Sequence, residues 1–391
     1  MFTNSKKDVK SLTRRIFMKI SIKNVCSVLV IVALLVGLVG AQSIEEKLSE
    51  MASKNAKLYV TPLVTAFGSG MNSGWFHSAK PHKLLGFDIG VRAMLVQVPT
   101  DQKTFNFDLS AIEPITESIP LGVLGTKTIT LDPDVIYPDR EVPTFFGKDE
   151  AAVIEADDEG IVADIKSQLL AQGVAQAVLD QPAIQSNLQS IANNIPDLTP
   201  PIIGTDLKSL PLAAPQAAVG LSIPTLPIKA EVVVRALPEI ELKDIGKFKF
   251  LGFGGKLALD PFIPIPMFPV NISVGAYLQK MSVGKVFETN HSLYTLMVGK
   301  DLSLLLFGVG VYGGVGMEKS KVKIKYTYNP ENPDPNDPIA PGTQIKFDLT
   351  GENKFRTTLG AHIRLTVFDI SADYSMGADN VLTAGLGISI R

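Results

Sequence analysis

The chain is almost free of cysteine. Its 391 residues contain one, Cys26, which lies inside an apolar run near the N-terminus. A chain with no other thiol has no internal disulfide, and with Cys26 inside that run we expect no thiolate nucleophile and no cysteine-ligated metal site. Charged residues are also sparse, at 19%, and the net charge of −2 at pH 7 gives no reason to expect nucleic acid as a partner.

Catalytic signatures are missing as well. The sequence contains no phosphate loop, dinucleotide fingerprint, zincin motif or Gly-x-Ser-x-Gly elbow. Acidic clusters at 132–141, 155–159 and 334–337 do not follow the twelve-residue calcium-loop pattern, so we expect them to be solvated loops. We therefore predict a protein without enzymatic activity, cofactor or bound metal.

The longest apolar run, VLVIVALLVGLV, covers 28–39. Lysines precede it, and Val39 and Ala41 stand at the small −3 and −1 positions of a signal-peptidase site. The run is shorter than the roughly 20 residues of a membrane-spanning helix. We predict a secretory signal peptide over 1–41, with an uncleaved anchor as the alternative and Met18 as an alternative start of translation.

Residues 42–83 are predicted to form a helix followed by a plug-like segment. Ser43 and Glu46 form a capping box, so the helix should begin near Ile44. The segment GMNSGWFHSAKPHK, 70–83, is rich in glycine, which permits tight turns. Its histidines lack the further partners that a metal site or a nucleophile would need. The candidate gate or plug residues are Trp75, His77 and His82.

From Leu85 onward the hydrophobic pattern has a period of two. In 355–367, apolar residues and threonine alternate with arginine, glycine, histidine and threonine. Successive strand side chains point to opposite faces, so one face is apolar and the other carries glycine and charge. Such segments run to roughly 10–13 residues, as in membrane-spanning strands, whereas ordinary strands average about 5–6. They recur at 85–95, 228–236, 270–279, 305–317, 368–376 and 382–391.

We therefore predict an all-β fold, a transmembrane antiparallel β-barrel of about 12–14 strands over 84–391. The count includes weaker segments near 57–66, 104–109, 124–131, 247–259, 292–303, 319–328 and 343–350. Arginine on the lipid face near mid-membrane would cost about 2–4 kcal/mol, so charged residues should face the lumen. The lumen-lining candidates are Asp88, Arg92, Arg356, His362, Arg364, Asp369 and Asp373. A soluble periplasmic lipid-binding β-protein, with the apolar face buried against a second sheet, is the alternative.

Residues 111–224 interrupt this pattern. Ile161, Ile165 and Leu169 recur at helical spacing, and a proline-rich stretch follows at 196–227. We predict a partly helical insertion that plugs the lumen or caps one mouth, with a long, partly disordered loop as the alternative.

Two stretches resemble a known family. GSGMNSGWFHSAKPHKLLGFDIGVRA, 68–93, is similar to the opening of an uncharacterised family of exported, barrel-like bacterial proteins, and LPIKAEVVVRALPEIELKDIGKFKFLGFGGKLAL, 226–259, resembles its middle. The resemblance implies a barrel and assigns no functional residue. The order of helix, glycine-rich segment and barrel is more distantly similar to outer-membrane transporters of hydrophobic compounds, although their opening motif is absent.

These observations lead us to expect a protein of the cell outer membrane, surrounded by its lipid. The barrel would be a channel, transporter or binder of a small, hydrophobic molecule. The alternative is a structural or surface-interaction barrel that anchors the 111–224 insertion. The sequence specifies neither the ligand nor the oligomeric state.

Overall fold

The computed structural model describes residues 53–390, except for 201, 223–226, 243–245, 266–268, 305–306, 328–341 and 343. The signal peptide predicted over 1–41 and the helix start predicted near Ile44 lie outside the described residues. None of the helices in the described part of the chain is long and apolar enough to cross a membrane.

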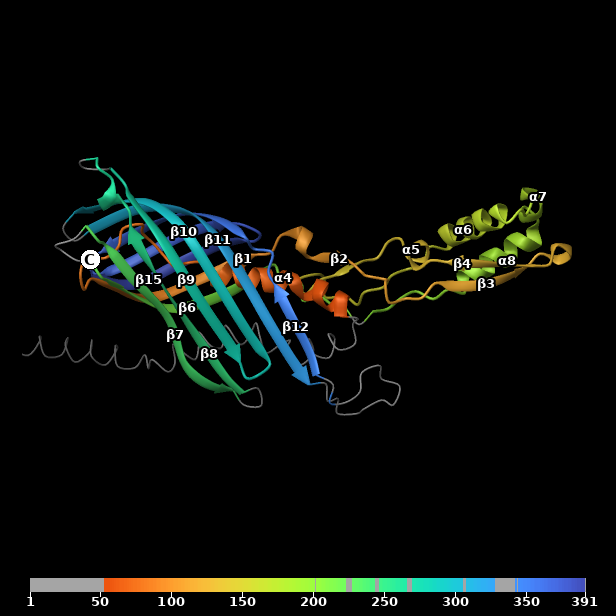
Figure 1. Cartoon of the computed structure of the whole chain (residues 1–391), viewed down its shortest axis with the longest axis horizontal. Coiled ribbons are helices and arrows are strands. Elements are labelled where there is room, and N and C mark those ends of the chain that lie inside the picture. Colours follow the sequence, from red (N-terminus) through yellow and green to blue (C-terminus); the bar gives the residue numbers. More distant parts are fainter. Residues whose placement is uncertain are drawn as a thin grey trace, which may run out of the picture.

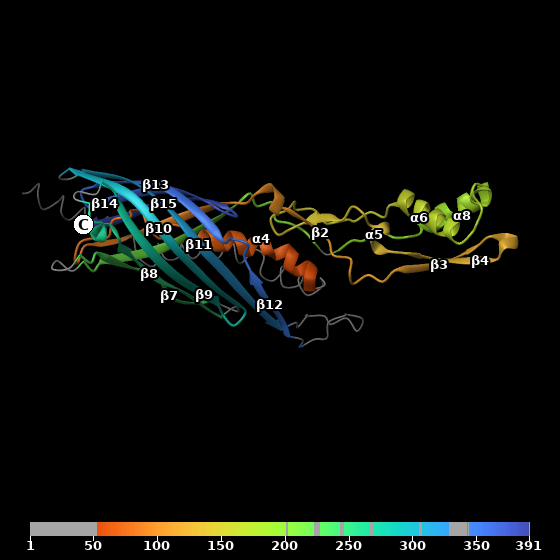
Figure 2. The same ribbon diagram turned by 45° about the horizontal axis from the view of Figure 1, so that its top comes forward.

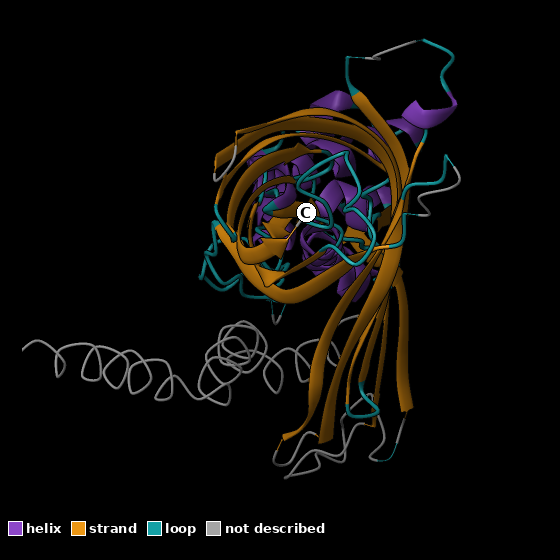
Figure 3. Ribbon diagram, turned by 90° about the vertical axis from the view of Figure 1, so that its left-hand side faces the viewer, coloured by secondary structure: helices purple, strands orange, loops and turns teal. Residues whose placement is uncertain are grey.

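The main sheet closes into an antiparallel barrel, as Figures 1 and 3 show. Its ten strands are β1 (Phe87–Gln97), β6 (Ser209–Gly220), β7 (Ala230–Leu242), β8 (Gly246–Ala258), β9 (Asn271–Val283), β10 (Phe287–Leu304), β11 (Phe307–Thr327), β13 (Phe355–Leu365), β14 (Phe368–Met376) and β15 (Asn380–Ile390). The first and last strands pair along their whole length, from Phe87 opposite Ile390 to Gln97 opposite Asn380. Pairing of β10 with β11 completes the circle. The predicted closed barrel is confirmed.

The barrel has ten strands rather than the 12–14 expected, because five of the weaker segments add no strand to it, whereas β6 was not expected. One of the five, 343–350, forms β12 (Gln344–Thr350), which extends the sheet beyond the barrel. Residues 57–66 belong to helix α4 (Ser53–Met71). Two others form β2 (Thr104–Asn106) and β4 (Thr126–Leu131), outside the barrel, while 319–328 largely continues β11. Alternation identifies a strand with two different faces, but it does not say which sheet the strand joins.

Side chains alternate between the two faces of the barrel wall. On β13, Leu359 and Ile363 are exposed on the outside, whereas Arg356 and His362 are buried inside. The same alternation holds on β14 and β15. The barrel therefore has an apolar exterior and a polar interior.

Several strands continue past one rim of the barrel and form a flap, visible as the long strand extensions in Figure 3. The flap comprises 237–242 of β7, 246–250 of β8, 279–283 of β9, 287–292 of β10, 318–327 of β11, and β12 (Gln344–Thr350). Its inner face buries Phe248, Val322 and Phe347 in the cluster that also contains residues of α4. Phe67 of α4 meets Phe287 of the flap edge to face, with ring centroids 6.4 Å apart.

Between β1 and β6 the chain leaves the barrel at this same rim and forms an elongated arm, residues 98–208 (Figures 1 and 2). Besides β2 and β4, the arm contains β3 (Ile115–Pro120), α5 (Pro133–Ile136), β5 (Glu141–Pro143), α6 (Asp158–Ala171), α7 (Gln176–Leu179) and α8 (Pro182–Asn193). Ile161, Ile165 and Leu169 of α6 are fully buried, as their helical spacing predicts. The buried apolar side chains of the arm belong to the same cluster as those of α4 and the flap.

The arm begins and ends earlier than the insertion expected over 111–224, because β6 belongs to the barrel. Pro211 and Pro215 made this stretch resemble a loop. Both lie in the part of β6 that pairs with β1, whereas β7 pairs only with 216–220. A proline, which has no N–H to donate, is tolerated at such a one-sided position.

Candidate functional site: the occupied lumen

The chain threads through its own barrel before the first strand begins. Helix α4 enters at the rim that carries the arm, and residues 69–86, the lumen segment, continue to the opposite rim (Figure 1). Near its start, the Ser69 hydroxyl donates to Asp379, in the β14–β15 turn. At its end, the Leu85 N–H donates to the Gly220 carbonyl, at the far end of β6. Polar contacts hold the lumen segment at four successive levels.

The first level centres on Arg356, at the start of β13. Its Nη1 donates to the Ser73 hydroxyl (2.7 Å), and Nη2 donates to the Ser69 carbonyl (2.6 Å). Its Nε lies 3.0 Å from a carboxylate oxygen of Glu318 on β11. Both charged side chains are buried. The wall therefore holds the lumen segment through a desolvated ion pair, which is strong only while all partners are in place.

The Asp379 carboxylate beside this level predicts a pH dependence. Burial raises its pKa to about 7, against hydrogen bonds from Ser69 and Gln102 that lower it. In the unfolded chain its pKa is about 3.9. The folded state thus binds the proton more tightly, and stability should rise as the pH falls from above 7 toward about 4. We expect a higher unfolding midpoint at pH 6 than at pH 8.

Asp379→Asn is the matching variant, because asparagine is neutral at both pH values. It should be less sensitive to pH than the wild-type chain over this interval. An unchanged difference between pH 6 and pH 8 would show that another group is responsible.

The second level is built around Arg235 of β7. Its Nη1 and Nη2 donate to the Met71 and Ser73 carbonyls (3.0 and 2.7 Å), and Nε donates to Gln216 (2.9 Å). The guanidinium carbon lies 3.9 Å from the ring centroid of Trp75, which stacks on Tyr277. A cation over an aromatic face is favourable, and more so when it is desolvated. Arg235 consequently fixes both the backbone and the largest side chain of the lumen segment.

The third level is a network of histidines and carboxylates. Arg92 Nη2 donates to His77 Nδ1 and to Asp88 (both 2.9 Å). His362 lies between Asp369 (3.2 Å) and Asp301 (3.1 Å). Each of these contacts joins groups of opposite charge or a donor to an acceptor, so the network gives its buried ionisable side chains partners inside the barrel.

His77, His362 and Asp369 bring potential ligand atoms within 4.8 Å of one another, a spacing that could suit a metal ion. The hydrogen bonds argue otherwise. Arginine only donates, so His77 Nδ1 must accept, and a neutral His77 then carries its proton on Nε2. That nitrogen faces Asp369 at 3.6 Å and cannot bind a metal while protonated. The geometry fits an ion-paired network better than a metal centre.

The fourth level lies near the rim opposite the arm. Glu231 accepts from the His82 backbone N–H (3.0 Å) and lies 2.6 Å from His82 Nδ1. Its other oxygen pairs with Lys256 (3.1 Å), which also donates to the Ser78 carbonyl (2.8 Å). All of these side chains are buried except for the small part of Lys256 and Glu231 that remains accessible. This cluster closes the second mouth around the lumen segment.

The comparisons with known proteins place the chain in a family without an assigned function. The profile of a family of unknown function, DUF6588, matches residues 18–390. The chain belongs to the DUF6588 family.

Neither of the other comparisons assigns this DUF6588 member a function. No curated protein matches the chain significantly. Among solved structures, the β domain of the Bordetella autotransporter Brka matches 46% of this chain and 90% of its own, with 13% identity and a TM-score of 0.21. A likeness this distant implies no shared function. Similarity to transporters of hydrophobic compounds stays a prediction.

The residues nominated from the sequence of this DUF6588 member mostly lie in the lumen. Trp75, His77 and His82 belong to the lumen segment and are buried. The wall residues that are buried inside the barrel are Asp88, Arg92, Arg356, His362, Asp369 and Asp373. Arg364 instead lies at the mouth opposite the arm, half-buried, and donates to Ser303 (2.9 Å).

Sequence analysis did not nominate Glu231, Arg235, Lys256 or Glu318. Glu231 and Arg235 lie on the polar face of a strand with alternating polarity, and this position is the sequence feature that could have identified them as lumen residues. Their partners are mainly main-chain groups and His82 of the lumen segment, whose path the alternation of the strands does not reveal.

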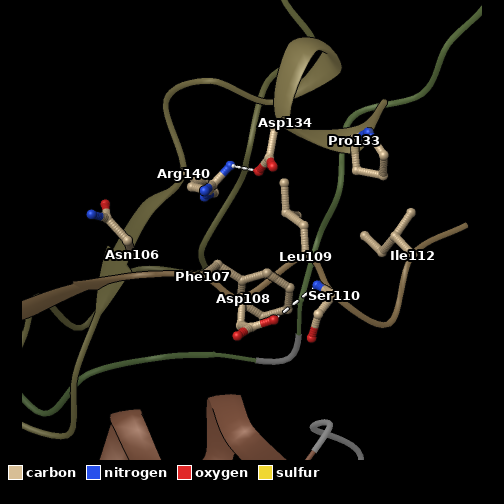
Figure 4. A pocket seen from close by; sticks show the side chains of 9 residues that line it. All are labelled: Asn106, Phe107, Asp108, Leu109, Ser110, Ile112, Pro133, Asp134 and Arg140. Atoms are coloured by element: carbon tan, nitrogen blue, oxygen red, sulfur yellow. Dashed lines mark hydrogen bonds and ion pairs between the residues drawn. The ribbon is translucent and has the colours of Figure 1, made fainter. Parts of the chain in front are cut away.

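A separate cleft of about 390 Å³ lies at the base of the arm (Figure 4). Apolar side chains and charged groups line it together, and Asp134 pairs there with Arg140. Asp108 accepts from the Ser110 N–H (2.8 Å), and its carbonyl accepts from Asn55 of α4 (2.9 Å). The cleft therefore marks the joint between the arm and the helix that enters the barrel.

Proposed function

We propose that the protein is an integral outer-membrane barrel that anchors and displays the arm, without enzymatic activity and with its lumen closed. The observation that supports this most directly is the lumen segment, held to the wall by buried polar contacts at four levels. A ten-stranded barrel is only slightly wider than the eight-stranded kind whose side chains already fill the interior. A chain segment inside it leaves little room for a solute.

The outer face supports the membrane part of the proposal. Strands β1, β13 and β15 each have 11 residues, within the about 9–11 that span a bilayer when tilted. Among the described residues, outward side chains over this height are apolar or small, with three exceptions near the rims. Gln97 and Asn380 lie at the rim with the arm, and Lys300 lies near the β10–β11 turn, where a long side chain can reach the headgroups. Aromatic residues flank the band, as in membrane barrels. They are Phe87, Phe307 and Phe368 at one end and Phe355 and Tyr374 toward the other.

The connections between strands suggest an orientation. The rim with the arm and flap also carries the long β11–β13 connection. The other rim carries the tight β10–β11 and β13–β14 turns and the connections 221–229 and 259–270, which are shorter than the arm and the β11–β13 connection. Outer-membrane barrels have short periplasmic turns and longer extracellular loops. On this basis the arm would face the cell exterior.

Protease treatment of intact cells tests this proposal. We expect a protease added outside to cleave the arm while the barrel remains in the outer-membrane fraction and keeps its heat-dependent shift on gels. A variant in which a short turn replaces 99–207 should insert equally well and show the same shift. Cleavage of the arm only after the outer membrane is permeabilised would contradict its display on the cell surface. Recovery of the protein in the soluble periplasm, without a gel shift, would contradict the proposal that the barrel is a membrane anchor.

Gated passage of a small molecule is the second candidate. It is favoured by the nature of the lumen contacts, which are ion pairs and hydrogen bonds that water could replace if the segment moved. The polar lining suits a polar solute better than the hydrophobic one expected from the sequence. Movement of the segment would expose Trp75, the single tryptophan of the chain, to a soluble fluorescence quencher. Constant shielding of Trp75 would favour the closed anchor.

A further inference from the structure

The outward face of β11 changes character along one continuous strand. Below the rim its outward residues include Val309, Val311, Val315 and Met317. In the flap the same face continues, at the same period of two, as Lys319, Lys321, Lys323 and Lys325, all exposed. Apolar side chains on β11 are thus followed directly by lysine side chains, at the level where the membrane hydrocarbon would end and the headgroups begin.

Neighbouring strands add to this lysine face. Lys280 of β9 and Lys321 of β11 flank Asn290 of β10 in register, and Lys346 of β12 lies opposite Lys325. Two acids share this face, since Glu288 of β10 and Asp348 of β12 lie in register with Lys323 on its two sides. Glu288 pairs with Lys280 (2.9 Å), and Glu239 pairs with Lys247 and Lys249. The face still carries more lysines than acids. Within the described residues, none of the four β11 lysines forms an ion pair with a carboxylate. The face is therefore a concentrated positive surface that faces solvent.

We propose that this lysine face binds the phosphate groups of lipopolysaccharide in the outer leaflet. The inference rests on the proposed outer-membrane location and on the orientation that places the flap outside. Lysine ammonium groups close to an anionic membrane surface each contribute about 1 kcal/mol, a factor of about five in affinity. The lysines lie next to the lipid-facing band on the same strand, so binding needs no movement of the barrel.

The height of the face favours lipopolysaccharide over a phospholipid. Six residues separate Lys319 from Lys325, which corresponds to about 20 Å along the strand. The polar layer of a phospholipid leaflet is only about 5–8 Å thick. Lipopolysaccharide is an anionic glycolipid whose headgroup extends further from the hydrocarbon, so it can meet the whole row.

The test compares two variants of the full chain that lose the same charge. In one, Lys319, Lys321, Lys323 and Lys325 are changed to glutamine. In the matched control, four arm lysines are changed to glutamine: Lys127, Lys148, Lys166 and Lys208. Binding to purified lipopolysaccharide, to dephosphorylated lipopolysaccharide and to phosphatidylglycerol is measured on refolded protein in neutral detergent, at low and high salt.

We expect the flap variant to bind phosphorylated lipopolysaccharide about 100-fold or more weakly than the wild type, since four such lysines are lost. The arm control should bind like the wild type, and removal of the phosphates should weaken wild-type binding to the level of the flap variant. Equal binding by both variants would overturn the inference, as would equal wild-type binding to phosphatidylglycerol. If the protein inserts into the membrane and shows the heat-dependent gel shift but does not bind lipopolysaccharide, this inference alone is overturned. If the protein does not insert, the proposed function is overturned.

Discussion

Replacing Glu231 with alanine is expected to lower the free energy of unfolding by about 3–5 kcal/mol, the usual effect of breaking a buried ion pair. Glu231 holds His82 of the lumen segment and neutralises Lys256, 3.1 Å away. Its removal leaves the Lys256 ammonium buried with one fewer countercharge and leaves the His82 N–H without its acceptor. Denaturant unfolding of the refolded barrel in detergent micelles measures this loss.

Glu288→Ala is a matched control on the same barrel. Glu288 also pairs with a lysine, Lys280 at 2.9 Å, but that pair lies on the outer face of the flap and is largely exposed. An exposed pair contributes about 0–1 kcal/mol, so the control should unfold almost like the wild type. Similar losses in both variants would mean that burial of the Glu231 cluster does not stabilise the fold.

The period of two was enough to predict the barrel and its polarity. It placed Arg356 and His362 on the face opposite Leu359 and Ile363, and the structure buries the first pair and exposes the second. The physical basis is local: a strand that separates hydrocarbon from a polar lumen must alternate, whichever strand it pairs with. Chain order alone was not enough to show which strand neighbours which, since β1 lies between β6 and β15.

The predicted number of barrel strands was too high because the flap, which has water on one face and α4 on the other, shows the same alternation as a membrane strand. Beyond Met317, β11 leaves the barrel, yet Val322 is still buried and Lys321 and Lys323 are still exposed because α4 and other inner-face residues cover one side of the flap. A water-exposed sheet packed on a helix therefore continues the pattern of a membrane strand. Likewise 57–66, rich in apolar residues, lies in a helix that packs on both the flap and the arm base.

The sequence indicated side chains of both the wall and the lumen segment, but not the contacts between them. Glycines around Trp75 and two histidines suggested a plug, and these residues do lie inside the barrel. Arg235 of the wall donates to the Met71 and Ser73 carbonyls of the lumen segment, and a main-chain acceptor leaves no trace in the sequence. The contact between Arg235 and Trp75 depends on where the segment crosses the lumen, which is a property of the closed barrel.

Replacing Arg235 with methionine should release the lumen segment at its second level. The change removes donors to three buried acceptors, each of which costs about 1–3 kcal/mol when left unsatisfied, so we expect a loss of about 3 kcal/mol or more. It also removes the cation over Trp75, and the emission of this single tryptophan should become more accessible to acrylamide. Arg364→Met makes the same substitution at the mouth, where the arginine is half-buried and contacts Ser303, so Trp75 should stay shielded there. Shielding that is unchanged in Arg235→Met would show that the other levels suffice to hold the segment, and a closed lumen would then not depend on this arginine.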